Sequence, residues 1–578
     1  MRKDCRPIRR AASSAVTGRA EDEDQVCVPM VKPATSKQVS DTVDSSDSRL
    51  PYGFVAVVLV VVVLFGSIRF RLRNIPLERD EGEYAYAGQL ILQGVPPYQL
   101  AYSMKLPGTY AAYAGILAVF GETPAGVHLG LIFLNAATTL VMYMLAAYLF
   151  GRMAGVVAAA NYALLSTSSS VLGLAGHATH FVVLPALAGL LLLLKALKAK
   201  RISLFFYSGL LLGLAVLMKQ PGIFFVAFAG VYVLYRECRR GSLNWRNVVK
   251  TVGTYSIGAI LPLAVTCVVL AASGVFARFW FWTWSYAHEY ASVLSIAEGA
   301  NMFRETFPQV IGPVLLVWVL AGAGLTALLW DRAARTHAPF VIGFLLFSAA
   351  AVCPGLYFRP HYFILLMPAV AVLTGLAVSS ATRKLHAISH SAIVTALPMV
   401  VFVLLFGYTI FQQRAIFFEA DPLAACRMIY GGNPFPEALQ VADYIRTHTS
   451  NEERIAVLGS EPEIYFYSGR RSATGYIYTY GLMEQQKYAL KMQREMVEQI
   501  GSERPSYVVA VLVPTSWLRQ PGSETLIFSW TDEYLQREYE VVGIVDIQEQ
   551  SNYVWGAAAT NYSPQSPFVL YVFKRKGP

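Results

Sequence analysis

The sequence is poor in charged residues. Asp, Glu, Lys and Arg make up 15% of its 578 residues, whereas hydrophobic residues make up 55%. Soluble domains carry roughly 25% charged residues, so this chain has too few charges to cover several of them. An aromatic content of 13% excludes a chain that is disordered over most of its length. We therefore expect most of the chain to lie in a lipid bilayer.

Cysteine is also scarce, and zinc-knuckle spacing and basic–aromatic repeats are missing. The six cysteines are scattered without a C-x-x-C pair, so neither a disulfide framework nor a metal site is expected. The net charge of +10 comes from basic residues at the ends of apolar runs, which is typical of a membrane protein rather than of a nucleic-acid partner. The cysteines are Cys5, Cys27, Cys238, Cys267, Cys353 and Cys426.

Eleven long apolar runs dominate the chain up to residue 411, and most have about the 20 residues that a membrane helix needs. Basic clusters occupy alternate connections between them, which defines one cytoplasmic side. The polar segment 1–50 is expected to be a disordered cytoplasmic tail, and the first run lies too far in to be a signal peptide. The runs are 52–68, 125–149, 153–172, 180–197, 202–217, 221–236, 251–271, 309–330, 337–353, 361–380 and 391–411. The basic clusters contain Arg152, Lys195, Lys198, Lys200, Arg201, Arg236, Arg239, Arg240, Arg246, Lys250, Arg332, Arg335, Arg383 and Lys384.

Segment 107–120 is apolar but short. If it were counted as a membrane span, every later basic cluster would lie on the opposite side of the membrane from the cytoplasm. We interpret it as a helix on the outer membrane surface. The outer face then carries residues 69–124, a long loop at 272–308 and everything after about 412. In residues 412–578, strand-like runs alternate with helical patterns, which predicts an extracytoplasmic α/β domain. The expected architecture is an all-α polytopic membrane domain (51–411) with this α/β domain behind it.

The most informative motif is Arg79-Asp80-Glu81-Gly82-Glu83-Tyr84-Ala85-Tyr86, just after the first span. Its acids fit the first turn of a helix, where negative charge stabilises the helix N-terminus. The alternative is catalytic: an acid held where lipid meets water can take a proton from an alcohol, and nearby cations can bind a phosphate leaving group.

Four further features follow this motif in order. They are Lys105-x-Pro107, a surface helix ending in Phe120-Gly121, another span, and an inner turn at Phe150-Gly151-Arg152. Over residues 52–411 the sequence resembles the GT-C membrane glycosyltransferases, in particular the protein O-mannosyltransferase-like family and the lipid A aminoarabinose transferase. The resemblance implies a polytopic GT-C fold, a catalytic Asp in the first outer loop and a polyprenyl-phosphate-linked sugar as donor. It assigns the base role to Asp80, with Glu81 as its neighbour.

Basic residues at other outer connections are candidates for holding the donor phosphate. Relatives often have Lys at the position of Lys219 and a basic-Pro-x-Tyr element at the position of Arg359. Both residues could instead anchor helix ends at the membrane interface. The candidate phosphate-binding set is Lys105, Lys219, Arg359, His361 and Tyr362.

The sequence departs from the family at three histidines. His128 stands where relatives often have Arg, and His177 and His180 stand where relatives often carry a second acid. A metal held by two acids is therefore not expected and no cofactor is required, with a divalent metal as the alternative. The two histidines fit either a substrate role or a polar pair at a membrane boundary.

Two aromatic segments are secondary candidates. Residues 279–290 (Phe-Trp-Phe-Trp-Thr-Trp-Ser-Tyr, then His288 and Glu289) are expected to form an amphipathic surface helix, with sugar stacking as the alternative. The tyrosines between 465 and 480 fit a packed turn or an acceptor site. Gly459 belongs to neither a G-x-G-x-x-G nor a P-loop motif, so no nucleotide is implied.

These observations predict an inverting glycosyltransferase that moves a sugar from a polyprenyl-phosphate carrier to an acceptor on the outer face of a membrane. The expected location is the bacterial inner (plasma) membrane, with membrane lipid and the lipid-linked donor as partners and the acceptor open. The alternative is a transporter or flippase of lipid-linked saccharide, which should show charges in mid-span and broken helices. A structural subunit would leave the first-loop acids without a role.

Overall fold

The computed structural model describes residues 52–239 and 244–577, which belong to one compact unit, Pro51–Pro578. The predicted disordered tail 1–50, Cys5, Cys27 and Arg240 lie outside the described residues.

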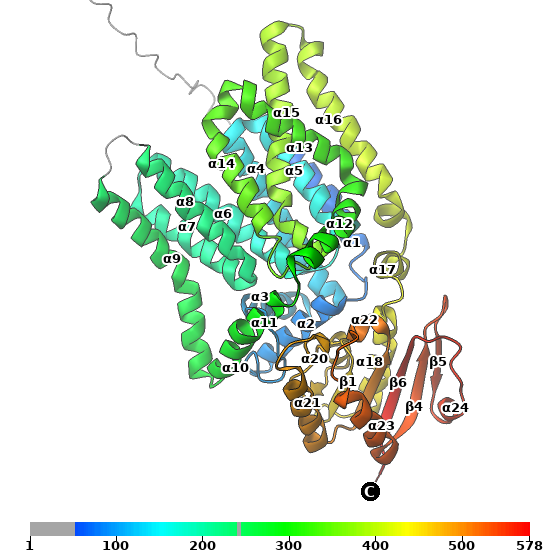
Figure 1. The fold of residues 1–578 in the computed structure, drawn as a ribbon. Coiled ribbons are helices and arrows are strands. Elements are labelled where there is room, and N and C mark those ends of the chain that lie inside the picture. Colours follow the sequence, from blue (N-terminus) through cyan, green and yellow to red (C-terminus); the bar gives the residue numbers. More distant parts are fainter. Residues whose placement is uncertain (1–51, 240–243, 578) are drawn as a thin grey trace, which may run out of the picture. The chain divides into compact units, whose positions relative to one another are not determined.

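Long helices form a bundle over residues 52–412 (Figure 1). Among the described residues, eight helical segments are long and apolar enough to cross a membrane, which identifies an integral membrane protein. Each of the eleven predicted runs overlaps a helix, but α5 and α7 are shorter and α15 is less apolar than these eight, so the count of eleven stays a prediction. The helices are α1 (Tyr52–Arg71), α4 (Pro124–Phe150), α5 (Arg152–Thr167), α6 (Ala178–Ala199), α7 (Ile202–Met218), α8 (Ile223–Cys238), α9 (Trp245–Ala272), α13 (Leu315–Trp330), α14 (Arg332–Ala350), α15 (Met367–Ile388) and α16 (Ala392–Gln412).

The bundle is apolar on the outside as well as in its core. Helices α5, α6 and α15 are buried along most of their length. By contrast, α9 and α16 expose large apolar side chains such as Val268 and Leu404, which are 69% and 67% exposed. An apolar surface of this extent is stable against lipid tails and not against water.

The connection between α1 and α4 contains two helices, α2 (Arg79–Leu92) and α3 (Gly108–Phe120). Helix α3 is the short apolar segment that the sequence places on the membrane surface; its position there stays a prediction. The two helices are closely packed, because a Cβ on Gly88 of α2 would lie 2.9 Å from the backbone nitrogen of Ala114 in α3. Only glycine permits this approach.

The connection after α9 is mostly helical, which corrects the expected long loop at 272–308. Its aromatic stretch 281–286 forms a π-helical turn rather than a regular surface helix, and α12 continues through η4 (Gly312–Val314) into α13. The elements are α10 (Phe276–Trp280), η3 (Phe281–Tyr286), α11 (Ala287–Ser292) and α12 (Ile296–Ile311).

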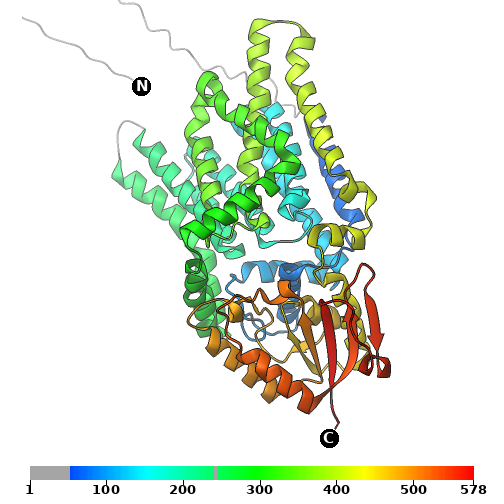
Figure 2. The same ribbon diagram turned by 45° about the vertical axis from the view of Figure 1, so that its right-hand side comes forward.

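Residues after α16, here called the C-terminal domain (412–578), form a six-stranded mixed sheet with helices around it (Figure 2). The strand order is β2-β1-β3-β6-β4-β5; β1 pairs in parallel with β2 and β3, and the other pairs are antiparallel. The four longer strands match the strand-like runs in the sequence. The short strands β2 and β5 were not predicted. The strands are β1 (Arg454–Leu458), β2 (Arg471–Ser472), β3 (Tyr507–Leu512), β4 (Tyr539–Asp546), β5 (Asn552–Trp555) and β6 (Val569–Arg575).

The remaining short elements complete the chain. Between the bundle helices lie η1 (Ser169–Val171), η2 (Gln220–Gly222) and η5 (Pro360–Leu365). The C-terminal domain adds η6 (Ala415–Glu419), α17 (Pro422–Tyr430), α18 (Phe435–His448), α19 (Glu463–Ser468), α20 (Tyr480–Met483), α21 (Ala489–Glu503), α22 (Pro514–Trp517), α23 (Leu526–Glu538) and α24 (Ala557–Thr560).

Helix α2 packs against the C-terminal domain and shares a hydrophobic core with it. The ring of Tyr86 lies 5.2 Å from that of Tyr465, and the Tyr86 hydroxyl accepts a hydrogen bond from the Ser472 backbone at 2.7 Å. A Cβ on Gly82 would lie 2.6 Å from the Glu463 nitrogen, so α2 and α19 touch backbone to backbone. The helix that carries Asp80 is therefore held between α3 and the C-terminal domain.

Candidate active site

Asp80 lies in the first turn of α2, and a capping box fixes where that helix begins. The Glu78 side chain accepts a hydrogen bond from the Glu81 backbone at 2.9 Å, and the Glu81 side chain accepts one from the Glu78 backbone at 3.4 Å. This reciprocal pair satisfies backbone donors that the helix leaves free. It also fixes the rotation of the first turn, which directs Asp80 into a cavity while Glu81 points away from it.

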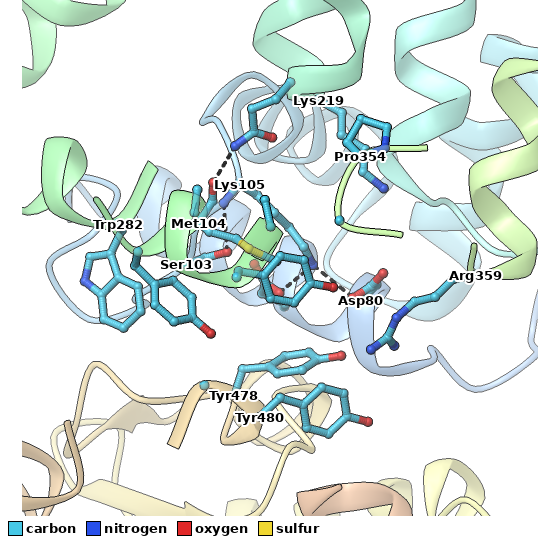
Figure 3. Close-up of a pocket in the computed structure, with 18 of the residues that line it drawn as sticks. Asp80, Ser103, Met104, Lys105, Lys219, Trp282, Pro354, Arg359, Tyr478 and Tyr480 are labelled. Carbon is cyan, nitrogen blue, oxygen red and sulfur yellow. Dashed lines mark hydrogen bonds and ion pairs between the residues drawn. The ribbon is translucent and has the colours of Figure 1, made fainter. Parts of the chain in front are cut away.

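The cavity has a volume of about 260 Å³ and is walled by segments far apart in the sequence (Figure 3). Charged residues from three connections meet in it: Asp80, Glu83 and Lys105 from the connection between α1 and α4, Lys219 after α7 and Arg359 before η5. Aromatic residues from the connection after α9 and from the C-terminal domain complete the wall. They are Trp282, Tyr286, Tyr290, Tyr476, Tyr478 and Tyr480.

Asp80 is an ionised carboxylate in this setting. The Lys105 ammonium donates to Asp80 at 2.9 Å and to Glu83 at 2.7 Å, and the Tyr110 hydroxyl donates to Glu83 at 2.7 Å. Burial by itself raises the pKa of Asp80, but the neighbouring Lys105 ammonium outweighs it and the nearby His177 and His361 add to this effect, so this pKa lies well below its usual value. The side chain is therefore deprotonated at neutral pH, which is the state that a general base needs.

Lys219 and Arg359 are cations without an acidic partner among the described residues. The Lys219 ammonium lies 4.0 Å from the centre of the Tyr362 ring, and the Arg359 guanidinium lies 5.7 Å from the ring centres of both Tyr357 and Tyr480. Burial lowers the pKa of Lys219 to about 7. Two cations that face one cavity from aromatic surroundings form a site for an anion.

Two histidines flank Asp80. His177 Nδ1 lies 3.7 Å from Asp80 Oδ2 and 3.6 Å from Glu78 Oε1, and His361 Nε2 lies 3.7 Å from the same Asp80 oxygen. The two imidazole rings are stacked with their centres 4.1 Å apart. Asp80, His177 and His361 bring one oxygen and two nitrogens within 4.8 Å of one another, a donor set that suits zinc better than magnesium.

Four of the predicted site residues do not line the cavity: Glu81, His128, His177 and His180. The Glu81 carboxylate accepts a hydrogen bond from the Gly176 backbone at 2.5 Å and lies 3.1 Å from His128 Nε2. The other nitrogen of His128 lies 2.8 Å from the Arg73 carbonyl. These contacts join α2 to α4 and to the turn before α6, so they hold the connection between α1 and α4 in place. His180 is buried in α6.

The structure adds residues that the sequence did not single out as site residues. Glu83 lies on the same side of α2 as Asp80, which its three-residue spacing could have indicated. Glu484 follows α20 and lines the cavity, although nothing in its local sequence points to a site. Arg79 donates hydrogen bonds to Ser460 and Tyr480 of the C-terminal domain, at 2.6 and 2.9 Å.

Comparisons with known proteins concern the fold. The model of the dolichyl-phosphate-mannose-protein mannosyltransferase family matches residues 105–271, which contain Lys105, His177 and Lys219. The fold is similar to that of ArnT from Cupriavidus metallidurans bound to undecaprenyl phosphate, with a TM-score of 0.55, 14% identity and coverage of 90% of this chain and 98% of that one. The chain has the GT-C glycosyltransferase fold.

A second GT-C structure covers a similar share of the chain. It is the oligosaccharyltransferase of Archaeoglobus fulgidus in its apo form, with a TM-score of 0.50, 14% identity and coverage of 89% of this chain and 76% of that one. A search with the sequence among curated proteins finds no match. The comparisons therefore establish the GT-C fold that the sequence predicts.

Proposed function

We propose that the protein is an inverting glycosyltransferase that uses a polyprenyl-phosphate-linked sugar as donor. One observation carries the proposal: an ionised carboxylate, Asp80, shares one cavity with two cations, Lys219 and Arg359, that have no acidic partner among the described residues. A base and a site for an anionic leaving group are the two parts that such a transfer needs. The undecaprenyl phosphate bound to ArnT supports a lipid-linked donor.

The donor phosphate is held between Lys219 and Arg359. Arginine offers a planar pair of donors to phosphate oxygens, and lysine adds a point charge. Tyr362, whose ring contacts Lys219, and His361 border the same place. Lys105, which the sequence predicts as a third phosphate cation, is paired with Asp80 and Glu83; we assign it to holding the base in place.

The transfer proceeds as a single displacement at the anomeric carbon. The acceptor hydroxyl donates a hydrogen bond to Asp80 and attacks from the face opposite the phosphate. A bond forms between the acceptor oxygen and the anomeric carbon, and the bond between that carbon and the phosphate oxygen breaks. The proton passes to Asp80, and the polyprenyl phosphate leaves with the bonding electrons and is stabilised by Lys219 and Arg359.

The reaction proposed here needs no metal ion. Asp80, His177 and His361 have a donor set that could hold zinc. However, the Lys105 ammonium already occupies Asp80 Oδ1 at 2.9 Å and places a positive charge beside the three ligands. This charge opposes a second cation at the same carboxylate.

The alternative function, a transporter or flippase, fits the cavity less well. The charged residues of the cavity come from the connections between the eight long apolar helices and from the C-terminal domain. A transporter requires charges near the middle of the membrane, usually beside broken helices.

We further propose that the cavity opens on the outer side of a bacterial plasma membrane, with the N-terminus in the cytoplasm. The alternating basic clusters support this orientation. Reporter fusions at residues 40 and 578 test it; both reporters on one side would contradict it.

The decisive experiment measures turnover with defined donors. The purified protein in detergent is given undecaprenyl-phosphate mannose, glucose or arabinose together with an envelope extract as the source of acceptors. We expect release of undecaprenyl phosphate and labelled glycoconjugate from at least one donor. No release from any donor, combined with movement of lipid-linked sugar across proteoliposomes, would overturn the proposal in favour of the flippase. Mass spectrometry of glycoconjugates lost on deletion of the gene then identifies the acceptor.

A further inference from the structure

The part of the cavity formed by the C-terminal domain differs from the cationic part. Figure 3 shows Tyr478 and Tyr480 below Asp80, Lys219 above it and Trp282 further to the left. Glu484 lines this part of the cavity as well. The cations explain how a phosphate is held, but they leave the acidic and aromatic part without a ligand.

Glu484 is a buried acid whose hydrogen-bonding partner lies on another element. Its carboxylate accepts a hydrogen bond from the Tyr286 hydroxyl at 2.8 Å. Within residues 52–239 and 244–577 Glu484 forms no ion pair, although the positive charge of Arg359 acts on it from a greater distance. A carboxylate has about four acceptor positions, so most of its capacity stays open to a ligand that donates hydrogen bonds. Burial raises the pKa of Glu484 to about 7, which a donating ligand would offset.

The contact between Tyr286 and Glu484 depends on a glycine. A Cβ on Gly481 would lie 2.5 Å from the Tyr286 hydroxyl oxygen, so a larger residue would displace the tyrosine. A second contact, the ion pair between Lys487 and Glu289, joins the same two segments. The pair is therefore built into the junction between η3 and α20.

Aromatic rings surround the pair and come from three parts of the chain. Tyr102 stacks on Trp282 with ring centres 5.4 Å apart, and Tyr476 meets these rings edge-on at 5.1 and 5.8 Å. Tyr286 meets Trp282 edge-on at 5.1 Å. Apolar ring faces next to a hydrogen-bond acceptor match a sugar ring, which has a C–H face and hydroxyl groups at its rim.

We propose that Glu484, Tyr286 and Trp282 form a subsite that binds a hydroxyl-bearing sugar ring. The inference rests on the proposed glycosyl transfer and names a substrate class for this part of the cavity. The ring could be the sugar of the donor or a terminal sugar of the acceptor, because both present the same chemistry here.

Size and wall structure favour a sugar over a peptide. About 260 Å³ lies below the range of about 300–1,000 Å³ that is usual for drug-sized ligands, so the ligand is small. One common way to bind an extended peptide is to pair it with the edge of a strand. None of the described strands β1–β6 contributes a residue to the cavity wall.

Saturation-transfer NMR with simple glycosides tests the subsite. The full chain in lipid nanodiscs is titrated with methyl glycosides of mannose, glucose, galactose and arabinose. We expect at least one to bind to the wild type. Binding should weaken about tenfold or more in Glu484→Gln and in Tyr286→Phe, since each removes part of a hydrogen bond to a charged group. Tyr286→Phe keeps the aromatic ring, so weaker glycoside binding in this variant is not explained by misfolding.

Matched variants distinguish the residues of the subsite from those that act in sugar transfer. Glu289→Gln alters the neighbouring acid, which faces Lys487 rather than the cavity, and should leave glycoside binding unchanged. Asp80→Asn should abolish transfer but keep glycoside binding. Wild-type binding in both Glu484→Gln and Tyr286→Phe, or no binding of any glycoside to the wild type, would overturn the inference and leave the proposed function intact.

The two sources of the sugar give different kinetics. If Glu484 holds the donor sugar, Glu484→Gln slows the hydrolysis of undecaprenyl-phosphate sugar in the absence of acceptor as much as it slows transfer. If it holds the acceptor sugar, hydrolysis is unchanged and the KM for the acceptor rises. Either result supports the subsite.

Discussion

Arg79 and Glu461 form a buried ion pair with a nitrogen–oxygen distance of 2.9 Å, and the Glu461 side chain has no exposed surface. Arg79 precedes Asp80 in α2, whereas Glu461 follows β1 in the C-terminal domain. The Arg79 side chain also donates to the Ser460 carbonyl at 2.6 Å and to the Tyr480 hydroxyl at 2.9 Å. Arg79, which is next to the proposed base Asp80, therefore joins α2 to the C-terminal domain, and this domain forms part of the cavity wall.

Arg79→Ala should destabilise the protein and lower kcat. Removing one partner of a buried pair leaves the other charge uncompensated, which typically costs about 3–5 kcal/mol. Thermal unfolding and kcat measure the two effects. Arg446→Ala is the matched control, because Arg446 pairs with Asp443 on the exposed surface of α18 and such pairs contribute about 0–1 kcal/mol. Equal unfolding temperatures for the two variants would contradict the prediction.

Asp80→Asn should lower kcat by about 10²- to 10⁴-fold, the usual cost of losing a general base. The protein should still fold, because Lys105 keeps its ion pair with Glu83. Turnover of undecaprenyl-phosphate sugar, normalised to folded protein, is the measurement. Near-normal turnover would remove Asp80 from the mechanism.

Arg359→Ala should raise the donor KM and lower kcat, because the leaving phosphate loses its bidentate partner. Arg359→Lys keeps the charge without the planar pair of donors and should give a smaller defect. Initial rates at varied donor concentration report both constants. An unchanged donor KM and kcat in Arg359→Ala would instead identify this residue as an interfacial anchor.

Donor binding should weaken as the pH rises through about 7. Burial lowers the pKa of Lys219 to about 7, so its ammonium is present below that pH and is lost above it. The phosphodiester of the donor keeps one negative charge throughout, so the change belongs to the protein. The donor KM measured from pH 6 to pH 9 should rise in the wild type. The rise should be smaller in Lys219→Arg, whose side chain remains charged, and what is left of it is due to Glu484, whose pKa is also about 7. Parallel profiles would refute the assignment.

Chelation should leave the rate unchanged, because Lys105 rather than a metal ion neutralises Asp80. The measurement is turnover before and after dialysis against EDTA, with metal content determined in parallel. A lost rate that zinc or manganese restores would instead assign Asp80, His177 and His361 as metal ligands.

Local patterns in the sequence predict most of the elements. Apolar runs predict the helices of the bundle, since each helix satisfies its own backbone hydrogen bonds within one continuous segment. The strand-like runs of residues 412–578 predict strands β1, β3, β4 and β6. The acids after the first span predict the start of α2, because negative charge favours the first turn of a helix. The structure adds a capping box between Glu78 and Glu81.

Which side chains meet is decided by packing between distant segments. The sequence places Asp80 and Glu81 side by side, yet only the rotation of α2 sends Asp80 into the cavity and Glu81 towards His128. Lys105 has the charge of a phosphate ligand, but the fold sets it between two carboxylates.

The part of the cavity wall that the C-terminal domain forms is the part that the sequence predicts least well. Tyr286 and Glu484 are 198 residues apart, and neither has a neighbour in sequence that marks it as a partner of the other. Their contact exists because α20 packs on η3 at Gly481. Helix and strand formation follow from local hydrogen bonding and polarity, so the sequence alone determines them. A buried hydrogen bond between remote segments forms only once the tertiary structure has excluded water from both.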